Sequence, residues 1–202
     1  MAQTNGDCVK VLKDLLSKKS GKSQGKTPSG AQPTFWMFTV PEVPKDNYNE
    51  VYPNILLGNR HVAKDKALLQ QLEVTHVLNA AQGVKFNQIP TSQDFYEDVS
   101  IQYLGIPAMD ISTYKMSKHF EEAAEFIDKA LSSGGKVFVH CMMGVSRSAT
   151  LIIAYLMMKK QMTVTDSIMQ IRSKRAIFPN DGFLLQLCTL NEELYGLVTA
   201  PS

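Results

Sequence analysis

The stretch from Lys136 to Met158 constrains the fold of this chain more than any other. It divides into three parts, "KVFVH", "CMMGVSRSA" and "TLIIAYLMM". The first part is apolar and β-branched without alternation, which is typical of a strand covered on both faces. The third part is apolar on every side, which is typical of a helix at the centre of a domain. The polar residues between them are therefore predicted to form the turn from a central strand to a central helix.

The chain around this stretch alternates between strand and helix patterns. Strands are predicted within "NILLG", "VTHVLNAA" and "IQYLGIP". Helices are predicted within "AKDKALLQQLE", "SKHFEEAAEFIDKAL", "TVTDSIMQIRSKR" and "NDGFLLQLCTLNEEL". With 202 residues, 44% of them hydrophobic, the chain can bury one sizeable core. We therefore predict an α/β fold, a single compact domain with a central, mostly parallel sheet flanked by helices.

The beginning of the chain differs in composition from the rest. Residues 18–34 are rich in Ser, Gly, Lys and Pro and contain hardly any apolar side chain, which predicts a flexible linker. Before this linker, the helical period places four apolar residues on one face: Val9, Leu12, Leu15 and Leu16. The short helix is either a frayed terminus or docks through this face on the domain, beside the functional site. The sequence alone does not decide between the two.

Charge and hydropathy limit the classes of partner. The formal net charge of +2 does not indicate electrostatic binding of nucleic acid. The longest apolar run is roughly half as long as a membrane-spanning helix requires. No apolar segment of a signal peptide follows the first basic residues. We therefore expect a soluble protein of the cytosol or nucleus that binds neither membranes nor nucleic acid.

The three cysteines, Cys8, Cys141 and Cys188, are irregularly spaced. Their spacing fits neither a disulfide framework nor a metal site, so free thiols are expected. Cys188 lies on the apolar face of a predicted helix, which favours a buried structural thiol. Cys8 is a candidate resolving thiol for an oxidised Cys141 if the N-terminal helix docks nearby. No feature of the sequence calls for a metal or a cofactor, and none is expected.

The strand-to-helix turn has the chemistry of an oxyanion site. The first N–H groups of a helix lack intrahelical partners and, together with the helix dipole, attract anions. Gly144 lets the backbone fold tightly around such an anion, and Arg147 can bind two of its oxygens. In that field the pKa of Cys141 is expected to fall, because thiols near helix N-termini and cations titrate at about 3.5–7.5. A thiolate beneath a bound phosphate is a nucleophile aimed at phosphorus.

These residues resemble a known family signature. The pattern His-Cys-x-x-Gly-x-Ser-Arg-Ser is similar to that of the cysteine-dependent protein phosphatases, and the surrounding chain resembles the VHR-type atypical dual-specificity phosphatases over about residues 47 to 195. The matching segments include "NEVYPNILLGN", "THVLNAA", "YLGIPAMD" and "PNDGFLLQLCTLNEEL". The resemblance implies two parts: an N-terminal helix and linker over residues 1–46, and a phosphatase catalytic domain over residues 47–198.

The resemblance also implies roles for individual residues. It makes Cys141 the nucleophile, Arg147 the phosphate clamp and Asp110, in the loop "IPAMDISTY", the general acid. Ser148 would donate a hydrogen bond to the cysteine sulfur, and His140 would support the loop from behind. The substrate-binding cradle would comprise the turn and one later basic residue: Met142, Met143, Gly144, Val145, Ser146, Arg147 and Arg175. Arg175 either contacts a second phosphate or lies on a solvated helix end, where the helix dipole favours a cation.

The variable positions of the turn bear on the substrate. Met142, Met143 and Val145 are apolar, whereas phosphoinositide-directed relatives commonly have lysines in this loop. An apolar surface in this loop suits an aromatic ring or a peptide side chain. The expected substrates are therefore phosphotyrosine and phosphoserine or phosphothreonine in proteins of the MAP kinase type. A non-protein substrate, such as the RNA 5′ end or the phosphorylated glucan that some relatives process, is the less favoured alternative. The oligomeric state cannot be read from the sequence.

A function of a different class competes with this interpretation. A weakly active or inactive member of the family could bind phosphorylated proteins as a scaffold without turnover. The presence of Cys141, Arg147, Ser148 and Asp110 favours the enzyme, because a pseudophosphatase usually lacks one of the first two.

Overall fold

The computed structural model describes residues 5–17 and 42–196. A five-stranded sheet with the strand order β1-β2-β5-β3-β4 forms its centre. The strands are β1 (Tyr48–Tyr52), β2 (Ile55–Gly58), β3 (His76–Asn79), β4 (Gln102–Gly105) and β5 (Val137–His140). β1 pairs antiparallel with β2, and the other neighbouring strands are parallel. The predicted α/β fold with a mostly parallel sheet is confirmed, and "KVFVH" supplies its middle strand.

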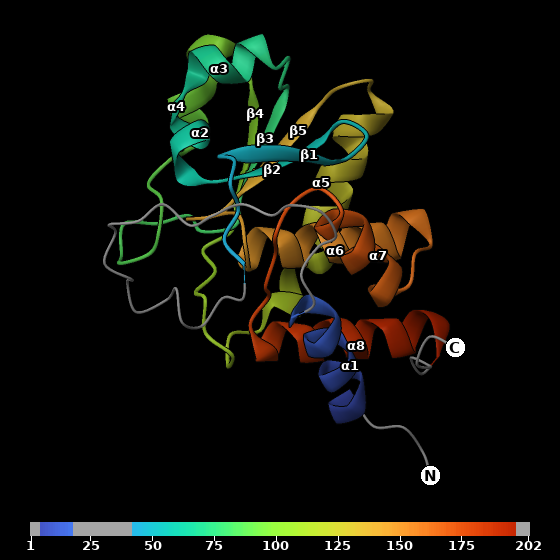
Figure 1. Ribbon diagram of the computed structural model, residues 1–202. Coiled ribbons are helices and arrows are strands. Elements are labelled where there is room, and N and C mark those ends of the chain that lie inside the picture. Colours follow the sequence, from blue (N-terminus) through green and yellow to red (C-terminus); the bar gives the residue numbers. More distant parts are fainter. Residues whose placement is uncertain (1–4, 18–41, 197–202) are drawn as a thin grey trace.

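Helices cover both faces of the sheet (Figure 1). On one side lie α2 (Arg60–Lys64), α3 (Lys66–Gln71) and α4 (Gln93–Tyr96). On the other side lie α5 (Phe120–Ser132), α6 (Arg147–Lys160), α7 (Val164–Arg172) and α8 (Asp181–Tyr195). Two short 3-10 segments, Glu97–Val99 and Met116–His119, precede β4 and α5. Among the described helices, none combines the length and the apolarity needed to cross a bilayer.

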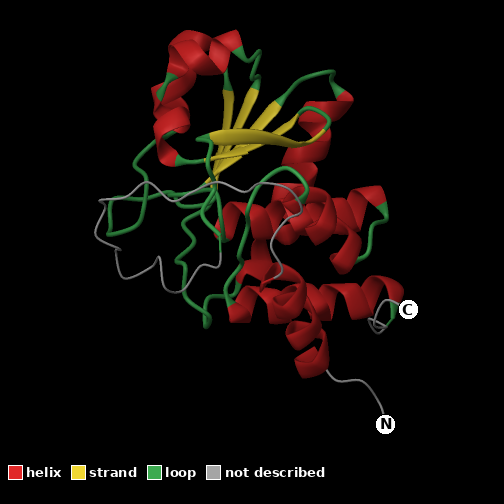
Figure 2. Cartoon of the chain, viewed as in Figure 1, coloured by secondary structure: helices red, strands yellow, loops and turns green. Residues whose placement is uncertain are grey.

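The sheet divides the core into two layers, because successive side chains of a strand point to opposite faces. Leu56, Val77 and Phe138 pack with the apolar residues of α2, α3 and α4. Their strand neighbours face the larger cluster on the other side, where α6 is buried from Arg147 to Met157. Figure 2 shows the sheet between these two groups of helices. The central buried strand and helix predicted from the sequence are therefore both present.

The segment predicted as one helix over residues 63–73 is instead two helices. Asp65 follows α2, and its Oδ1 accepts a hydrogen bond at 3.0 Å from the backbone N–H of Leu68 in the first turn of α3. An aspartate that bonds to a nearby backbone N–H favours a helix start over a helix interior. The short elements β1 and α4 were not predicted, because neither carries an extended apolar pattern.

The N-terminal helix α1 (Asn5–Ser17) is docked on α8 (Figure 1). Leu12 and Leu16 are buried in the main core cluster. At the edge of the contact, Lys13 Nζ lies 2.9 Å from Asp181 Oδ2 at the start of α8. Docking through this apolar face is thus confirmed, and the helix on which α1 docks is α8. The linker predicted over residues 18–34 lies outside the described residues.

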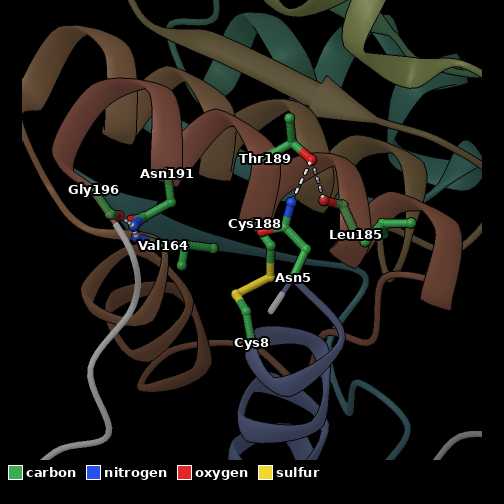
Figure 3. The surroundings of a disulfide bond; sticks show 8 residues. All are labelled: Asn5, Cys8, Val164, Leu185, Cys188, Thr189, Asn191 and Gly196. Atoms are coloured by element: carbon green, nitrogen blue, oxygen red, sulfur yellow. Dashed lines mark hydrogen bonds between the residues drawn. A yellow bond between two sulfur atoms is a disulfide. The ribbon is translucent and has the colours of Figure 1, made fainter. Parts of the chain in front are cut away.

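Docking of α1 also joins two cysteines that the sequence analysis expected to be free. Cys8 and Cys188 form a disulfide bond between α1 and α8 (Figure 3). The prediction of free thiols is therefore wrong for both residues, and Cys8 pairs with Cys188 rather than with Cys141. Their sequence separation of 180 hides this pairing, and helix packing brings the two Cα atoms to 6.1 Å. Cys141 is a free, buried cysteine.

Candidate active site

The site lies at the carboxyl end of β5, where His140 is followed by the turn into α6. Gly144 in this turn has φ 67°, a left-handed conformation that favours glycine. A Cβ atom on Gly144 would lie 2.4 Å from the carbonyl oxygen of Gly58 at the end of β2. Ser146, the N-cap residue of α6, makes no side-chain cap hydrogen bond. The first N–H groups of α6 are therefore not satisfied by their own cap and suit an oxyanion.

Cys141 lies at the start of this turn and is only 2% exposed. The hydroxyl of Ser148 donates a hydrogen bond to its Sγ at 3.2 Å. Burial opposes ionisation of the thiol, but the charge of Arg147 and the hydrogen bonds from Ser148 outweigh it. Together they lower the pKa of Cys141 below its ordinary value. The predicted thiolate and its predicted hydrogen-bond donor are therefore in contact.

The guanidinium of Arg147 is held in one orientation by two backbone carbonyls. Its Nη1 donates to the carbonyl oxygens of Asn87, at 2.8 Å, and Ala108, at 3.1 Å. Nε is buried without a hydrogen-bond partner in the structure and lies 3.5 Å from Asp110 Oδ2. A buried donor of this kind gains from an oxygen acceptor, so Nε is one group with which Arg147 can bind a phosphate oxygen.

Asp110 is placed beside the turn by neighbours from two different elements. Its Oδ1 accepts hydrogen bonds from Ser146 Oγ at 2.7 Å and from Asn180 Nδ2 at 2.9 Å. The Asp110 side chain remains 30% exposed, whereas that of Arg147 is 3% exposed. The carboxylate therefore combines a defined position with access to solvent. The structure brings four predicted residues into one site: Cys141, Arg147, Ser148 and Asp110.

Asn180 is a residue of the site that the sequence analysis missed. It is the N-cap of α8, where its Oδ1 accepts a hydrogen bond from the N–H of Phe183 at 3.1 Å while its Nδ2 donates to Asp110. Its backbone N–H also donates to Ser146 Oγ at 3.3 Å. The pattern Pro-Asn-Asp before an apolar helix signals a cap, but no local signal indicates that the amide also reaches an acid 70 residues away.

His140 lies behind the turn, as expected, but as an uncharged residue. It is fully buried at the end of β5 and stacks on Phe138 with a ring separation of 5.6 Å. Burial lowers the pKa of His140 to about 3. Neither ring nitrogen has a hydrogen-bond partner in the structure. A neutral, packed imidazole suits a supporting position better than proton transfer.

Arg175 is placed differently from the prediction that it contacts a second phosphate. It is 3% exposed and donates hydrogen bonds to the carbonyl oxygens of Met143 and Gly144 at 2.8 and 2.9 Å. Nη1 donates to the carbonyl of Asp46 and to Asn49 Oδ1. These bonds occupy four of the five N–H donors of a guanidinium. The geometry therefore gives Arg175 a role in supporting the turn, in place of the predicted contact with a second phosphate.

The apolar surface predicted within the turn is smaller than expected. Val145 is 6% exposed, and its carbonyl accepts a hydrogen bond from the N–H of Phe178 at 2.9 Å. Val145 thus belongs to the inner side of the loop. Met142 and Met143 are partly exposed, and Met142 packs against the core. Only these two methionines can contribute apolar surface to a bound substrate from the turn itself.

Comparison with known families identifies the domain that carries this site. The family model "Dual specificity phosphatase, catalytic domain" matches residues 55–193, a range that includes every element from β2 to most of α8. The chain belongs to the dual specificity phosphatase family. It is a cysteine-dependent protein phosphatase, and the single free cysteine among the described residues, Cys141, lies in the cradle.

Solved structures of dual specificity phosphatases are similar to this chain over most of its length. Human DUSP28 is 26% identical with a TM-score of 0.65, and the match covers 76% of this chain and 99% of that one. DUSP15 is 30% identical with a TM-score of 0.59, covering 74% and 96%. The human tyrosine phosphatase-like serine/threonine/tyrosine-interacting protein is also 30% identical, with a TM-score of 0.59 and coverage of 73% and 97%. These neighbours support an atypical dual specificity phosphatase.

Proposed function

We propose that this phosphatase hydrolyses phosphotyrosine and phosphoserine or phosphothreonine in proteins through a phosphocysteine intermediate. One observation carries the proposal: Cys141, with its lowered pKa, receives a hydrogen bond from Ser148 and shares a cradle with Arg147 and Asp110. A thiolate, an anion clamp and a carboxyl group are the three parts that an in-line displacement at phosphorus requires.

In the first step the Cys141 thiolate attacks phosphorus while the bond from phosphorus to the substrate oxygen breaks. Protonated Asp110 gives its proton to the departing oxygen, which leaves as an alcohol or phenol. Arg147 and the N–H groups at the start of α6 compensate the negative charge on the phosphoryl oxygens. The first step thus ends with a phosphocysteine and an aspartate carboxylate.

In the second step water attacks phosphorus, and the Asp110 carboxylate accepts a proton from it. The sulfur–phosphorus bond breaks, and inorganic phosphate and the Cys141 thiolate are released. The hydrogen bond from Ser148 to Sγ stabilises the thiolate as it leaves. Both Asp110 and Cys141 return to their starting states, so the cycle balances.

The expected substrates are activation segments of MAP kinase-type proteins, which carry phosphate on threonine and tyrosine. The test measures phosphate release from a doubly phosphorylated Thr-x-Tyr peptide and from a single phosphotyrosine peptide by wild type, Cys141→Ser and Asp110→Asn. Loss of turnover in the first variant and a strong decrease in the second support the proposal. Mass spectrometry of quenched reactions detects the phosphocysteine, and its absence in an active enzyme contradicts the intermediate.

A scaffold that binds phosphoproteins is the second candidate function. It is favoured by one observation, the similarity to the human tyrosine phosphatase-like serine/threonine/tyrosine-interacting protein. Peptide binding without phosphate release by pure wild type under reducing conditions would select this function. The cytosolic or nuclear location expected from the sequence is likewise a proposal, and fractionation of cells that contain the tagged full chain tests it.

A further inference from the structure

We infer that the mouth of the active site binds apolar side chains on either side of the phosphorylated residue, so that the preferred substrates are phosphoprotein segments with apolar neighbours of that residue. This inference rests on the proposed function and specifies its substrate class. The surface that carries it consists of Val84, Phe86, Met109 and Ile111, which we call the apolar rim.

The apolar rim is unusually exposed. Phe86 is 93% and Val84 is 90% exposed, and Met109 and Ile111 are 46% and 47% exposed. Exposed single apolar residues are common on protein surfaces, but four of them on two loops that meet at one site indicate a binding surface. Other exposed large apolar residues of the described chain, such as Met169 on α7 and Leu185 on α8, lie on helices outside these loops.

Contacts of Arg147 bring the two loops of the apolar rim to the same place. Its Nη1 donates to the carbonyl of Asn87, the residue after Phe86, and to the carbonyl of Ala108, the residue before Met109. Met109 and Ile111 also directly flank Asp110 in the chain. The same guanidinium that is proposed to clamp the phosphate therefore anchors both loops beside it.

Hydrogen bonds hold the loop that carries Phe86. The N–H of Gly83 donates to the carbonyl of Ile89, and the N–H of Gln88 donates to the carbonyl of Lys85. The Gln88 side chain in turn accepts a hydrogen bond from the N–H of Lys85 at 3.1 Å. At the base of the loop, Asn79 Nδ2 donates to the Ile89 carbonyl at 3.0 Å. The loop thus presents Val84 and Phe86 on a turn whose ends are fixed to the sheet.

The occupant is a polypeptide, because a phosphorylated side chain that enters the cradle brings its neighbours in the chain beside these two loops. Once the phosphate is bound by Arg147, the neighbouring residues of an extended substrate lie about 3.3 Å further along the chain for each position. The residues directly before and after the phosphorylated one therefore lie within reach of the loops that carry Phe86, Met109 and Ile111. Apolar side chains at these positions remove both surfaces from water, whereas polar ones do not.

The experiment compares two phosphotyrosine peptides of equal length and charge, with leucine or with asparagine at the positions directly before and after the phosphorylated residue. Because contact with the apolar rim removes the leucine side chains from water, kcat/KM should be about tenfold higher for the leucine peptide. In Phe86→Ser this ratio should fall severalfold, because Met109 and Ile111 still contact the peptide, and in Phe86→Ser with Met109→Ser it should fall close to one. Met169→Ala, which removes an exposed apolar residue elsewhere, should retain the ratio.

A ratio near one in wild type, or a ratio that survives both Phe86→Ser and Met109→Ser, overturns the inference. Failure of the proposed function is seen separately, because wild type and Met169→Ala would then release no phosphate from para-nitrophenyl phosphate. In that case binding of both peptides to Cys141→Ser, measured by calorimetry, still tests the apolar rim. Equal affinity for the leucine and asparagine peptides contradicts it, and tighter binding of the leucine peptide supports it.

Discussion

Removal of the disulfide between Cys8 and Cys188 should destabilise the folded protein more than any exposed substitution. The bond closes a loop between residues that are 180 apart in the sequence. In the chain-entropy account, a cross-link over a loop of this length removes conformational entropy from the unfolded state and so raises its free energy by about 5 kcal/mol. Measured values are commonly smaller, so we expect a loss of about 2–5 kcal/mol in the free energy of unfolding.

The loss has a local component at the N-terminus. Without the disulfide, α1 is held in place by the burial of Leu12 and Leu16, by the ion pair between Lys13 and Asp181 of α8 and by a hydrogen bond from Arg172 of α7 to the Leu16 carbonyl. The ion pair is exposed and contributes at most about 1 kcal/mol. Amide exchange in α1 should therefore accelerate on reduction before exchange in α6, which is buried on all sides.

Urea unfolding of the full chain with and without a thiol reductant measures the global effect. Cys8→Ser serves as the matched control, because it should resemble reduced wild type under both conditions. For a chain of this size, a loss of 2–5 kcal/mol corresponds to a decrease in Tm of roughly 5–20 °C. Equal unfolding midpoints for oxidised and reduced wild type, with mass spectrometry confirming both redox states, would refute the argument.

Three further perturbations test the site. Asn180→Ala removes a hydrogen bond to Asp110 and should lower kcat about tenfold with little change in KM, while Asn180→Ser, which retains a capping oxygen but not the amide donor, should show the same decrease; an unchanged kcat would exclude a positioning role. Gly144→Ala places a Cβ atom 2.4 Å from the Gly58 carbonyl at φ 67° and should lower Tm by several degrees and abolish turnover, whereas a fully active variant would show that the turn is adaptable. The pKa of His140 is about 3 in the folded protein and near 6.5 in the unfolded chain, so the folded state binds fewer protons between these two pH values. The free energy of unfolding should therefore decrease by roughly 1.4 kcal/mol per pH unit as the pH falls from 6.5 toward 3. His140→Phe should reduce this slope, and urea titrations at each pH measure it.

The parts of the fold that depend on local sequence could be predicted. The apolar run before Cys141 and the apolar helix after it indicate burial on both sides, and they are the middle strand and the most buried helix of the domain. The composition of the turn between them indicates an anion site, because glycine, arginine and uncapped helix N–H groups act within a few residues of one another. Cys141, Arg147 and Ser148 lie within eight residues and could therefore be assigned together.

The remaining features depend on contacts between distant segments, which no local pattern records. The pairing of Cys8 with Cys188 exists only because α1 docks on α8, and the reach of Asn180 to Asp110 exists only because α8 begins beside the acid loop. Arg175 has the charge to bind a phosphate, but tertiary structure places it under the turn, where carbonyl oxygens use its donors. Sequence alone determined which chemistry is present at the strand-to-helix turn. Tertiary structure decided which distant side chains surround it, because side chains far apart in the chain become neighbours only when their helices and loops pack.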